Sequence, residues 1–216
     1  MSGPLPDENT LAAFDYAMTN GCDGFEFDVR HSRDQRSVLC HDATLEKLEV
    51  AANHYTDLRS RRAGLCCLED VLARFGGTAY LDIELKVSGN EADVVSSLQA
   101  HPPQRGYIVS SFLPEVLLRL HEIDPNVPLG YICDRAEAAH LWTELPVTVF
   151  LPHYSLIAQR LVDEVHAHKM QVMTWTVNRR QVLLRLAGWG VDGIIADDPT
   201  LLARTFATLP SPSAKP

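Results

Sequence analysis

Several features common in other protein classes are absent from this sequence of 216 residues. No apolar run approaches the ~18 residues that a membrane-spanning helix requires. The formal net charge is −9 and no basic run is longer than Arg59–Arg62, which argues against a nucleic-acid partner. The chain has none of the patterns G-x-S-x-G, G-x-x-x-x-G-K-[ST] and G-x-G-x-x-G. Their absence argues against an α/β-hydrolase, a P-loop protein and a dinucleotide-binding protein.

Disulfides are also not indicated. The cysteines number five, an odd count, and none form a C-x-x-C pair. Adjacent Cys66 and Cys67 cannot easily bridge each other, so the thiols are expected to be reduced and to serve as small core residues, as in a reducing compartment. We therefore expect a soluble, cytoplasmic protein. The residues carry no signal for its oligomeric state.

Short apolar or β-branched runs alternate with helical patterns along the whole chain, which predicts β-α units around a parallel sheet. The length and a hydrophobic content of 46% fit one α/β domain, expected over residues 1–208, with a disordered Pro/Ser-rich tail at 209–216. Strands are predicted at 24–30, 37–41, 79–86, 107–111, 128–132, 147–151, 171–177 and 192–196. Helices are predicted at 10–20, 68–75, 92–99, 114–123, 136–141, 155–168 and 179–189, with Asn9 and Asn178 as N-caps.

Two of these strands carry acids where a buried strand would normally carry apolar residues. Side chains alternate between the two faces of a strand, so Glu26 and Asp28 share one face, roughly 6–7 Å apart at the backbone. The segment "YLDIELK" repeats the pattern, with Asp82 and Glu84 on one face. Each strand thus has an acidic row opposite an apolar row.

Buried carboxylates need partners, because an isolated buried charge costs several kcal/mol or more. Oxygen ligands close together suit a hard divalent ion, Mg²⁺ or Ca²⁺. Two other interpretations stay open at this point. The acidic rows could be exposed faces of an antiparallel sheet, or the acids could be paired with Arg30 and Lys86.

His41-Asp42 ends the strand "SVLCHD", and active sites of α/β barrels lie at the carboxyl ends of their strands. A histidine at such a position can be catalytic or simply structural. Asp197 and Asp198 follow "GIIA" and could be ligands, although a loop that ends a strand explains them as well. Trp175 could belong to the core or to a pocket wall.

With these residues identified, the chain resembles the glycerophosphodiester phosphodiesterase family. The run "DENTLAAFDYAMTNGCDGFEFDVRHSRDQRSVLCHDATL" is similar to that family's P-E-N-T, then G-x-D-x-x-E-x-D-V, then V-x-x-H-D. "LDIELK" resembles its L-x-I-E-x-K strand, and "VSSF", "VMTWTVN" and "GVDGIIADDP" resemble its later strands in the same order. The similarity covers nearly the whole chain.

The resemblance implies a TIM-type (β/α)8 barrel that hydrolyses a small-molecule glycerophosphodiester to glycerol 3-phosphate and an alcohol. It implies attack by the glycerol 2-hydroxyl on phosphorus, followed by opening of a cyclic phosphate by water. An imidazole can give or take a proton near neutral pH, which suits such a reaction. The resemblance implies the following site residues: Glu26, Asp28 and Glu84 as ligands of one divalent cation, Mg²⁺ or Ca²⁺; His41 as a catalytic residue; and Lys86, Phe112 and Trp175 as substrate-binding residues.

The resemblance fails at one place. The family's first strand ends in H-R-G shortly before P-E-N-T and supplies a second catalytic histidine and an arginine, whereas this chain begins "MSGPLPDENT". Either the native enzyme is longer, or the barrel lacks its first strand and has an open edge beside residues 24–30. In the second case we expect a catalytically impaired member that binds a phosphodiester or a partner protein. A related activity on sphingo- or lysophospholipids ranks lower, because no apolar membrane-binding loop is evident.

Overall fold

The computed structural model describes residues 5–207, so the predicted tail at 209–216 lies outside the described residues. Within them, the main sheet is curved and its eight strands run in the order β10-β9-β8-β7-β6-β5-β1-β2. All neighbouring pairs are parallel except β1 and β2. The strands are β1 (Gly24–His31), β2 (Ser37–Leu39), β5 (Tyr80–Leu85), β6 (Tyr107–Ser111), β7 (Leu129–Cys133), β8 (Val149–Pro152), β9 (Gln171–Thr174) and β10 (Gly193–Ile194).

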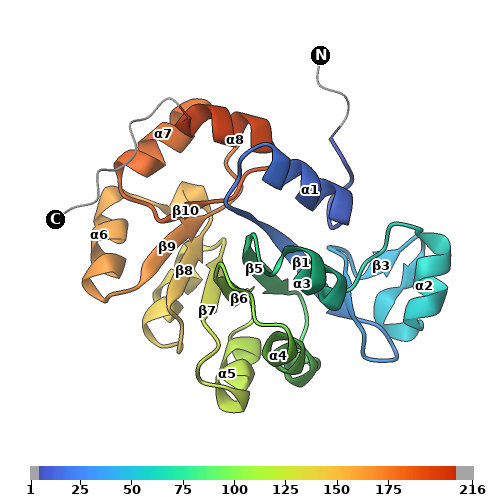
Figure 1. Ribbon diagram of the computed structural model, residues 1–216. Coiled ribbons are helices and arrows are strands. Elements are labelled where there is room, and N and C mark those ends of the chain that lie inside the picture. The colour runs from blue at the N-terminus through green and yellow to red at the C-terminus, as the bar shows by residue number, and fades with distance from the viewer. Residues whose placement is uncertain (1–4, 208–216) are drawn as a thin grey trace.

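Helices surround this sheet on its outer face (Figure 1). They are α1 (Leu11–Thr19), α3 (Leu68–Phe75), α4 (Glu91–Ala100), α5 (Pro114–Ile123), α6 (Gln159–Ala167), α7 (Arg180–Gly188) and α8 (Pro199–Phe206). The predicted helix at 136–141 is a 3₁₀ segment, η2 (Ala136–Thr143), and 3₁₀ segment η3 (Tyr154–Leu156) precedes α6. Within residues 5–207, no helix combines the length and the hydropathy needed to cross a membrane.

The barrel is open between β1 and β10. A closed TIM barrel has eight parallel strands, whereas residues 5–207 supply seven, and β1 and β10 do not pair with each other. The outer helices nevertheless meet across this opening: α1 and α8 lie side by side, and the Tyr16 hydroxyl lies 3.2 Å from Thr200 Oγ1. The predicted TIM-type architecture is confirmed, and no strand precedes α1 within the described residues.

The apolar rows of β1 and β5 form the core under the helices. Phe27, Val29, Leu81, Ile83 and Leu85 have no exposed surface, and they pack with apolar residues of α3 and α4. The acidic rows lie on the opposite face, toward the interior of the barrel. Because β1 and β5 are parallel neighbours and their acids are largely buried, the interpretation as exposed faces of an antiparallel sheet is wrong.

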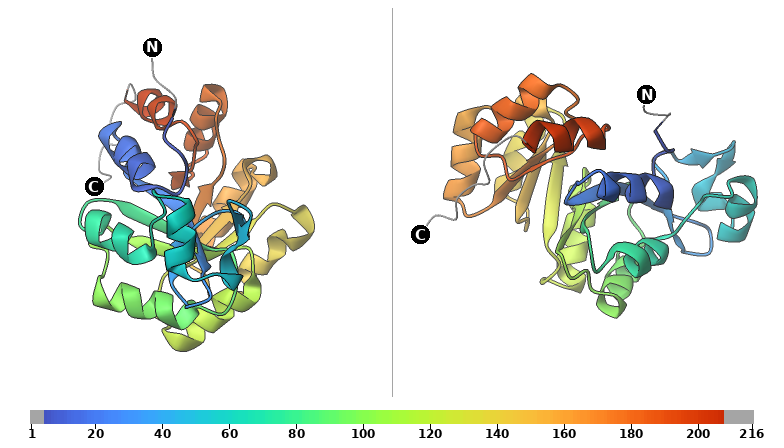
Figure 2. Two further views of the ribbon diagram at one scale, coloured as in Figure 1. Left: turned by 90° about the vertical axis from the view of Figure 1, so that its right-hand side faces the viewer. Right: turned by 45° about the horizontal axis from the view of Figure 1, so that its top comes forward.

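An excursion between β2 and α3, which the sequence patterns did not predict, lies beside the barrel (Figure 2). It contains β3 (Thr44–Leu45), β4 (Leu48–Glu49), η1 (Val50–Ala52) and α2 (Tyr55–Arg61). It has its own small apolar core, formed by Val38, Cys40, Leu45, Val50, Leu58 and Leu65. The excursion therefore packs as a satellite of the main core.

The two predicted asparagine caps are wrong. Thr10 caps α1 by accepting from the Ala13 N–H, and α7 begins after Arg179, which makes no side-chain cap. Asn9 and Asn178 instead hold acids of the candidate site, as described below. Both asparagines thus have tertiary partners that a local pattern cannot reveal.

Candidate active site

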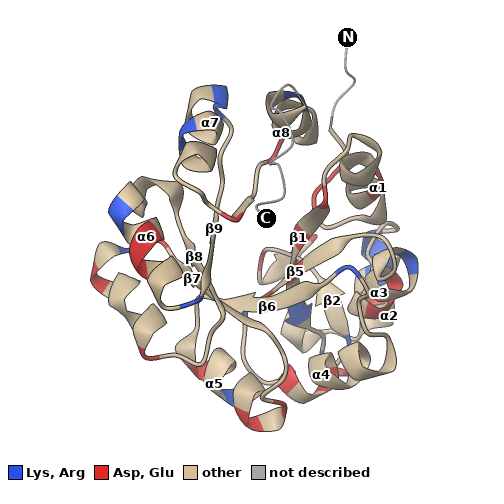
Figure 3. Cartoon of the chain, turned by 60° about the vertical axis from the view of Figure 1, so that its left-hand side comes forward, with Lys and Arg blue, Asp and Glu red and all other residues tan. Residues whose placement is uncertain are grey.

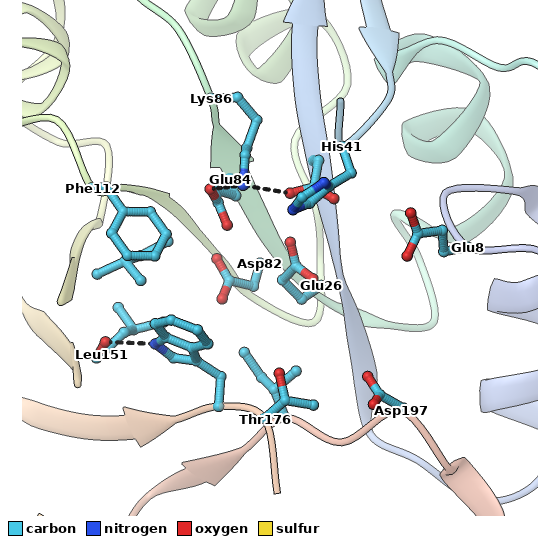
Figure 4. Close-up of a pocket in the computed structure, with 14 residues that line it drawn as sticks. Glu8, Glu26, His41, Asp82, Glu84, Lys86, Phe112, Leu151, Thr176 and Asp197 are labelled. Carbon is cyan, nitrogen blue, oxygen red and sulfur yellow. Dashed lines mark hydrogen bonds and ion pairs between the residues drawn. The ribbon is translucent and has the colours of Figure 1, made fainter. Parts of the chain in front are cut away.

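The parallel register of β1 and β5 brings the two acidic rows together. Asp28 lies opposite Glu84, and Glu26 lies opposite Asp82. Side chains at opposite positions of neighbouring strands are close enough to interact. All four carboxyl groups line one cavity of about 320 Å³ at the carboxyl ends of the strands (Figure 4).

Three of these groups could share one cation. Glu26, Asp28 and Glu84 each offer a carboxylate oxygen, and these oxygens lie within 4.8 Å of one another. The buried Glu26 Oε1 has no hydrogen-bond partner within the described residues. Burial raises the pKa of Glu26 well above its usual value, and the charges of Asp28, Asp82 and Glu84 raise it further. An all-oxygen donor set of three carboxylates fits a hard divalent cation.

Lys86 supplies the positive charge nearest to this cluster. Its Nζ lies 2.7 Å from Glu84 Oε1 and 3.2 Å from Asp28 Oδ1. Burial lowers the pKa of Lys86, but the two carboxylates raise it more, so the ammonium group stays charged. The interpretation that the acids are paired with Lys86 is therefore correct for Asp28 and Glu84, whereas Arg30 pairs with neither.

Asp82 lies deeper in the cavity and accepts a hydrogen bond from the Ser110 hydroxyl. Burial raises its pKa to about 7; the Ser110 bond opposes this effect and the charges of Glu84 and Asp28 add to it. Asp82 is not part of the three-carboxylate cluster. It is therefore a fourth acid that can hold a proton near neutral pH.

His41 follows β2 and reaches the cavity from the side of the excursion. Its Nδ1 lies 2.9 Å from Asp42 Oδ1, and both side chains are largely exposed. Its Nε2 has no hydrogen-bond partner within the described residues, while its carbonyl oxygen accepts from Arg30 Nε at 2.9 Å. Asp42 thus orients the imidazole ring through Nδ1, and Nε2 is available to a bound molecule.

An apolar wall faces the acids. Phe112 follows β6 and Trp175 follows β9, and their rings meet edge to face with centroids 5.4 Å apart. Trp175 Nε1 donates to the Leu151 carbonyl at 2.9 Å, which fixes the indole. Ile132, Leu151 and Ile195 complete this side of the cavity. One cavity therefore contains the seven site residues that the family resemblance implied: Glu26, Asp28, His41, Glu84, Lys86, Phe112 and Trp175.

Two further carboxylates line the cavity: Glu8, to which the sequence analysis gave no role, and Asp197, which it named only as a possible ligand. Glu8 belongs to the loop before α1, and Asp197 belongs to the segment between β10 and α8. Neither belongs to the cluster that could share a cation, so Asp197 is not brought together with the three acids as a ligand. Asp198, considered with it, instead caps α8 by accepting from the Thr200 and Leu201 N–H groups. Position within the "DENT" run was the only available signal for Glu8.

The chain was compared with known proteins. The sequence model of the Glycerophosphoryl diester phosphodiesterase family matches residues 1–201. A glycerophosphodiester phosphodiesterase of Caldanaerobacter subterraneus subsp. tengcongensis is 28% identical, over 90% of each chain. One from Bacillus subtilis is 26% identical, over 93% of this chain and 82% of its own. An Oleispira antarctica phosphodiesterase solved with the product sn-glycerol-3-phosphate has the same fold, with a TM-score of 0.82 and 22% identity over 94% of this chain and 93% of its own. The chain therefore belongs to the glycerophosphoryl diester phosphodiesterase family.

Proposed function

We propose that the chain hydrolyses glycerophosphodiesters to glycerol 3-phosphate and an alcohol, with one divalent cation held by Glu26, Asp28 and Glu84. The observation that carries this proposal is the cluster of three carboxylates within 4.8 Å, next to an exposed histidine in the same cavity. Family membership and the named activity of the curated relatives support the reaction class. The cation is Mg²⁺ or Ca²⁺, since both prefer oxygen ligands.

Each site residue has a distinct task in this proposal. The bound cation would polarise the phosphoryl oxygens and lower the cost of their growing negative charge. Lys86 neutralises part of the carboxylate cluster and adds positive charge on the same side of the cavity. Phe112 and Trp175 form a rigid apolar surface for the carbon skeleton of the substrate and limit access of water on that side.

His41 is the proton-transfer group. Its free Nε2 can take a proton from a hydroxyl or give one to a departing alkoxide, while Asp42 holds Nδ1. The course implied by the family is attack of the glycerol 2-hydroxyl on phosphorus, departure of the alcohol and opening of the cyclic phosphate by water. In each of the two steps, His41 can take the proton of the attacking hydroxyl or water and give it to the departing oxygen.

The experiment is release of glycerol 3-phosphate from glycerophosphodiesters, with Mg²⁺ or Ca²⁺ and after treatment with EDTA. We expect product with the cation, loss of product with EDTA and recovery on adding the cation back. Glu26→Gln should abolish turnover with Mg²⁺ and with Ca²⁺. Turnover that neither EDTA nor Glu26→Gln affects would refute the cation assignment.

One observation favours a second candidate function. His41 is the only histidine among the described residues that line the cavity, whereas the family's reaction uses a pair. A binding protein without turnover would be stabilised thermally by a diester together with the cation, and it would release no glycerol 3-phosphate. Product formation at more than the uncatalysed rate contradicts this candidate.

A further inference from the structure

The carboxylates of the cavity carry more negative charge than Lys86 and one divalent cation can offset. Six carboxyl groups and one ammonium group line it: Glu8, Glu26, Asp28, Asp82, Glu84, Asp197 and Lys86. Even with Asp82 neutral, Lys86 and a divalent cation together offset only three of the other five negative charges. With Asp82 set aside, the carboxylates outside the cation cluster are Glu8 and Asp197, which equal the remaining two charges in number.

These two carboxylates lie on one side of the cavity. Figure 4 shows Glu8 and Asp197 opposite Phe112 and Leu151, with Glu26, Asp82 and Glu84 between the two sides. Figure 3 shows the acidic character of β1, of β5 and of the segment that enters α8. The cavity therefore has an apolar side, a central cation cluster and an acidic side.

Both side chains are exposed, and only the Asp197 carboxylate has a hydrogen-bond partner among the described residues. The Glu8 side chain has no hydrogen-bond or ion-pair partner in the described chain, while Arg62 Nη2 donates to its carbonyl oxygen at 3.3 Å. Asn178 Nδ2 donates to Asp197 Oδ2 at 2.6 Å, and the Asp197 N–H donates back to Asn178 Oδ1 at 3.0 Å. Neither carboxylate is paired with a cationic side chain of the described residues, and the Arg62 guanidinium does not line the cavity.

In-line displacement at phosphorus places the attacking and leaving oxygens on opposite sides of the phosphoryl group. With the phosphoryl group at the central cluster, the carbon skeleton of glycerol fits the apolar side. The departing alcohol then lies on the acidic side. We propose that Glu8 and Asp197 make the site selective for glycerophosphodiesters whose alcohol carries a positive charge, of the choline or ethanolamine type.

This selectivity rests on the proposed function. It is tested with two diesters of nearly the same shape, glycerophosphocholine and its neutral isostere with 3,3-dimethylbutanol. Their alcohols differ in intrinsic reactivity, so the readout is the ratio of the two kcat/KM values, compared among variants. That intrinsic difference cancels when variants are compared.

The ratio is kcat/KM for glycerophosphocholine divided by kcat/KM for the neutral diester. We expect Glu8→Gln and Asp197→Asn each to lower this ratio by about three- to tenfold, because each removes one unit of negative charge several ångströms from the cationic group. The double variant should lower it further. Asp197→Asn keeps an oxygen that can accept from Asn178. Glu164→Gln, an exposed acid on α6, is the matched control and should leave the ratio unchanged. A ratio that is the same in the wild type and in the double variant overturns the selectivity while leaving the hydrolase activity standing.

If the wild type cleaves neither diester, the proposed hydrolysis fails. The selectivity is then decided by calorimetric titration of the Mg²⁺- or Ca²⁺-loaded protein and of the same variants with both diesters. Tighter binding of glycerophosphocholine that disappears in the double variant supports it. Equal binding of the two diesters, or binding of neither, contradicts it.

Discussion

Asn9 and Asp28 hold each other through two reciprocal hydrogen bonds. Asn9 Nδ2 donates to Asp28 Oδ2 at 2.8 Å, and the Asp28 N–H donates to Asn9 Oδ1 at 2.9 Å. Asn9 has φ 56°, in the left-handed region that asparagine tolerates better than most residues. It thereby covers the edge of β1 that faces the opening of the barrel, and it orients a proposed cation ligand.

Asn9→Ala should therefore weaken cation binding by about 10- to 100-fold, the usual cost of losing a residue that orients a ligand. It should also destabilise the fold by about 1–3 kcal/mol, because the buried Asp28 N–H loses its partner. Calorimetric titration with Mn²⁺ measures the affinity. Asn178→Ala is the control, since Asn178 holds Asp197 outside the cation cluster. Equal affinities in both variants would contradict this role for Asn9.

His41→Gln should lower kcat by about 10²- to 10⁴-fold if His41 transfers the proton. Cation affinity should be unchanged, because His41 is not part of the carboxylate cluster. Asp42→Asn should cost less than about tenfold, since the His41–Asp42 pair is exposed and such pairs contribute little. Steady-state kinetics and Mn²⁺ titration separate the two effects. Wild-type kcat in His41→Gln would rule out the assignment.

The pKa of Asp82 predicts a pH dependence of stability in the cation-free protein. Burial raises this pKa from 3.8 to about 7, so between about pH 4 and pH 7 the folded chain keeps a proton that the unfolded chain has released. Stability is therefore lost as pH rises through this window. Asp82→Asn removes this loss, so its Tm relative to that of the wild type should rise from pH 4 to pH 7.

Thermal melts in EDTA at several pH values measure this difference. Hydrogen bonds from Ser32 and from the Asn126 N–H lower the pKa values of Asp34 and Asp124, respectively, and so give the opposite pH dependence. They do so in both proteins and cancel in the difference. Parallel Tm curves for wild type and Asp82→Asn would show that Asp82 does not titrate in this range.

Gly24 should not tolerate a side chain. A Cβ at this position would lie 1.9 Å from the Tyr80 carbonyl oxygen, in the pairing of β1 with β5 that aligns the two acidic rows. Gly24→Ala should destabilise the fold by about 3 kcal/mol or more. Gly188→Ala is the control, because Gly188 lies in α7 with no atom near the added Cβ, and it should gain about 0.4–1 kcal/mol. Denaturant melts of both variants distinguish these outcomes, and similar stabilities would contradict the close approach.

The acidic rows could be predicted from the sequence because strand alternation is a local property. Side chains two positions apart in a strand face the same way whatever surrounds them, so Glu26 and Asp28 had to share a face, as did Asp82 and Glu84. Their convergence required the register of β1 with β5, for which the sequence offered only the family resemblance.

The other interactions of the site depend on residues far apart in the chain. Asn9 and Asn178 have the residue type and spacing of helix caps, yet each bonds an acid 19 residues away. Glu8 and Asp197 reach the cavity only because α1 and α8 meet across the opening of the barrel. No local pattern of charge or hydrophobicity encodes these distances, so the sequence alone could not reveal the acidic side of the cavity.

The central claim is that one divalent cation binds between Glu26, Asp28 and Glu84. The most direct measurement is anomalous diffraction from a crystal of the protein loaded with Mn²⁺. We predict one strong peak within coordination distance of all three carboxylates, and no such peak in crystals of Glu84→Gln. A peak elsewhere in the molecule, with none at these three side chains, would contradict the account.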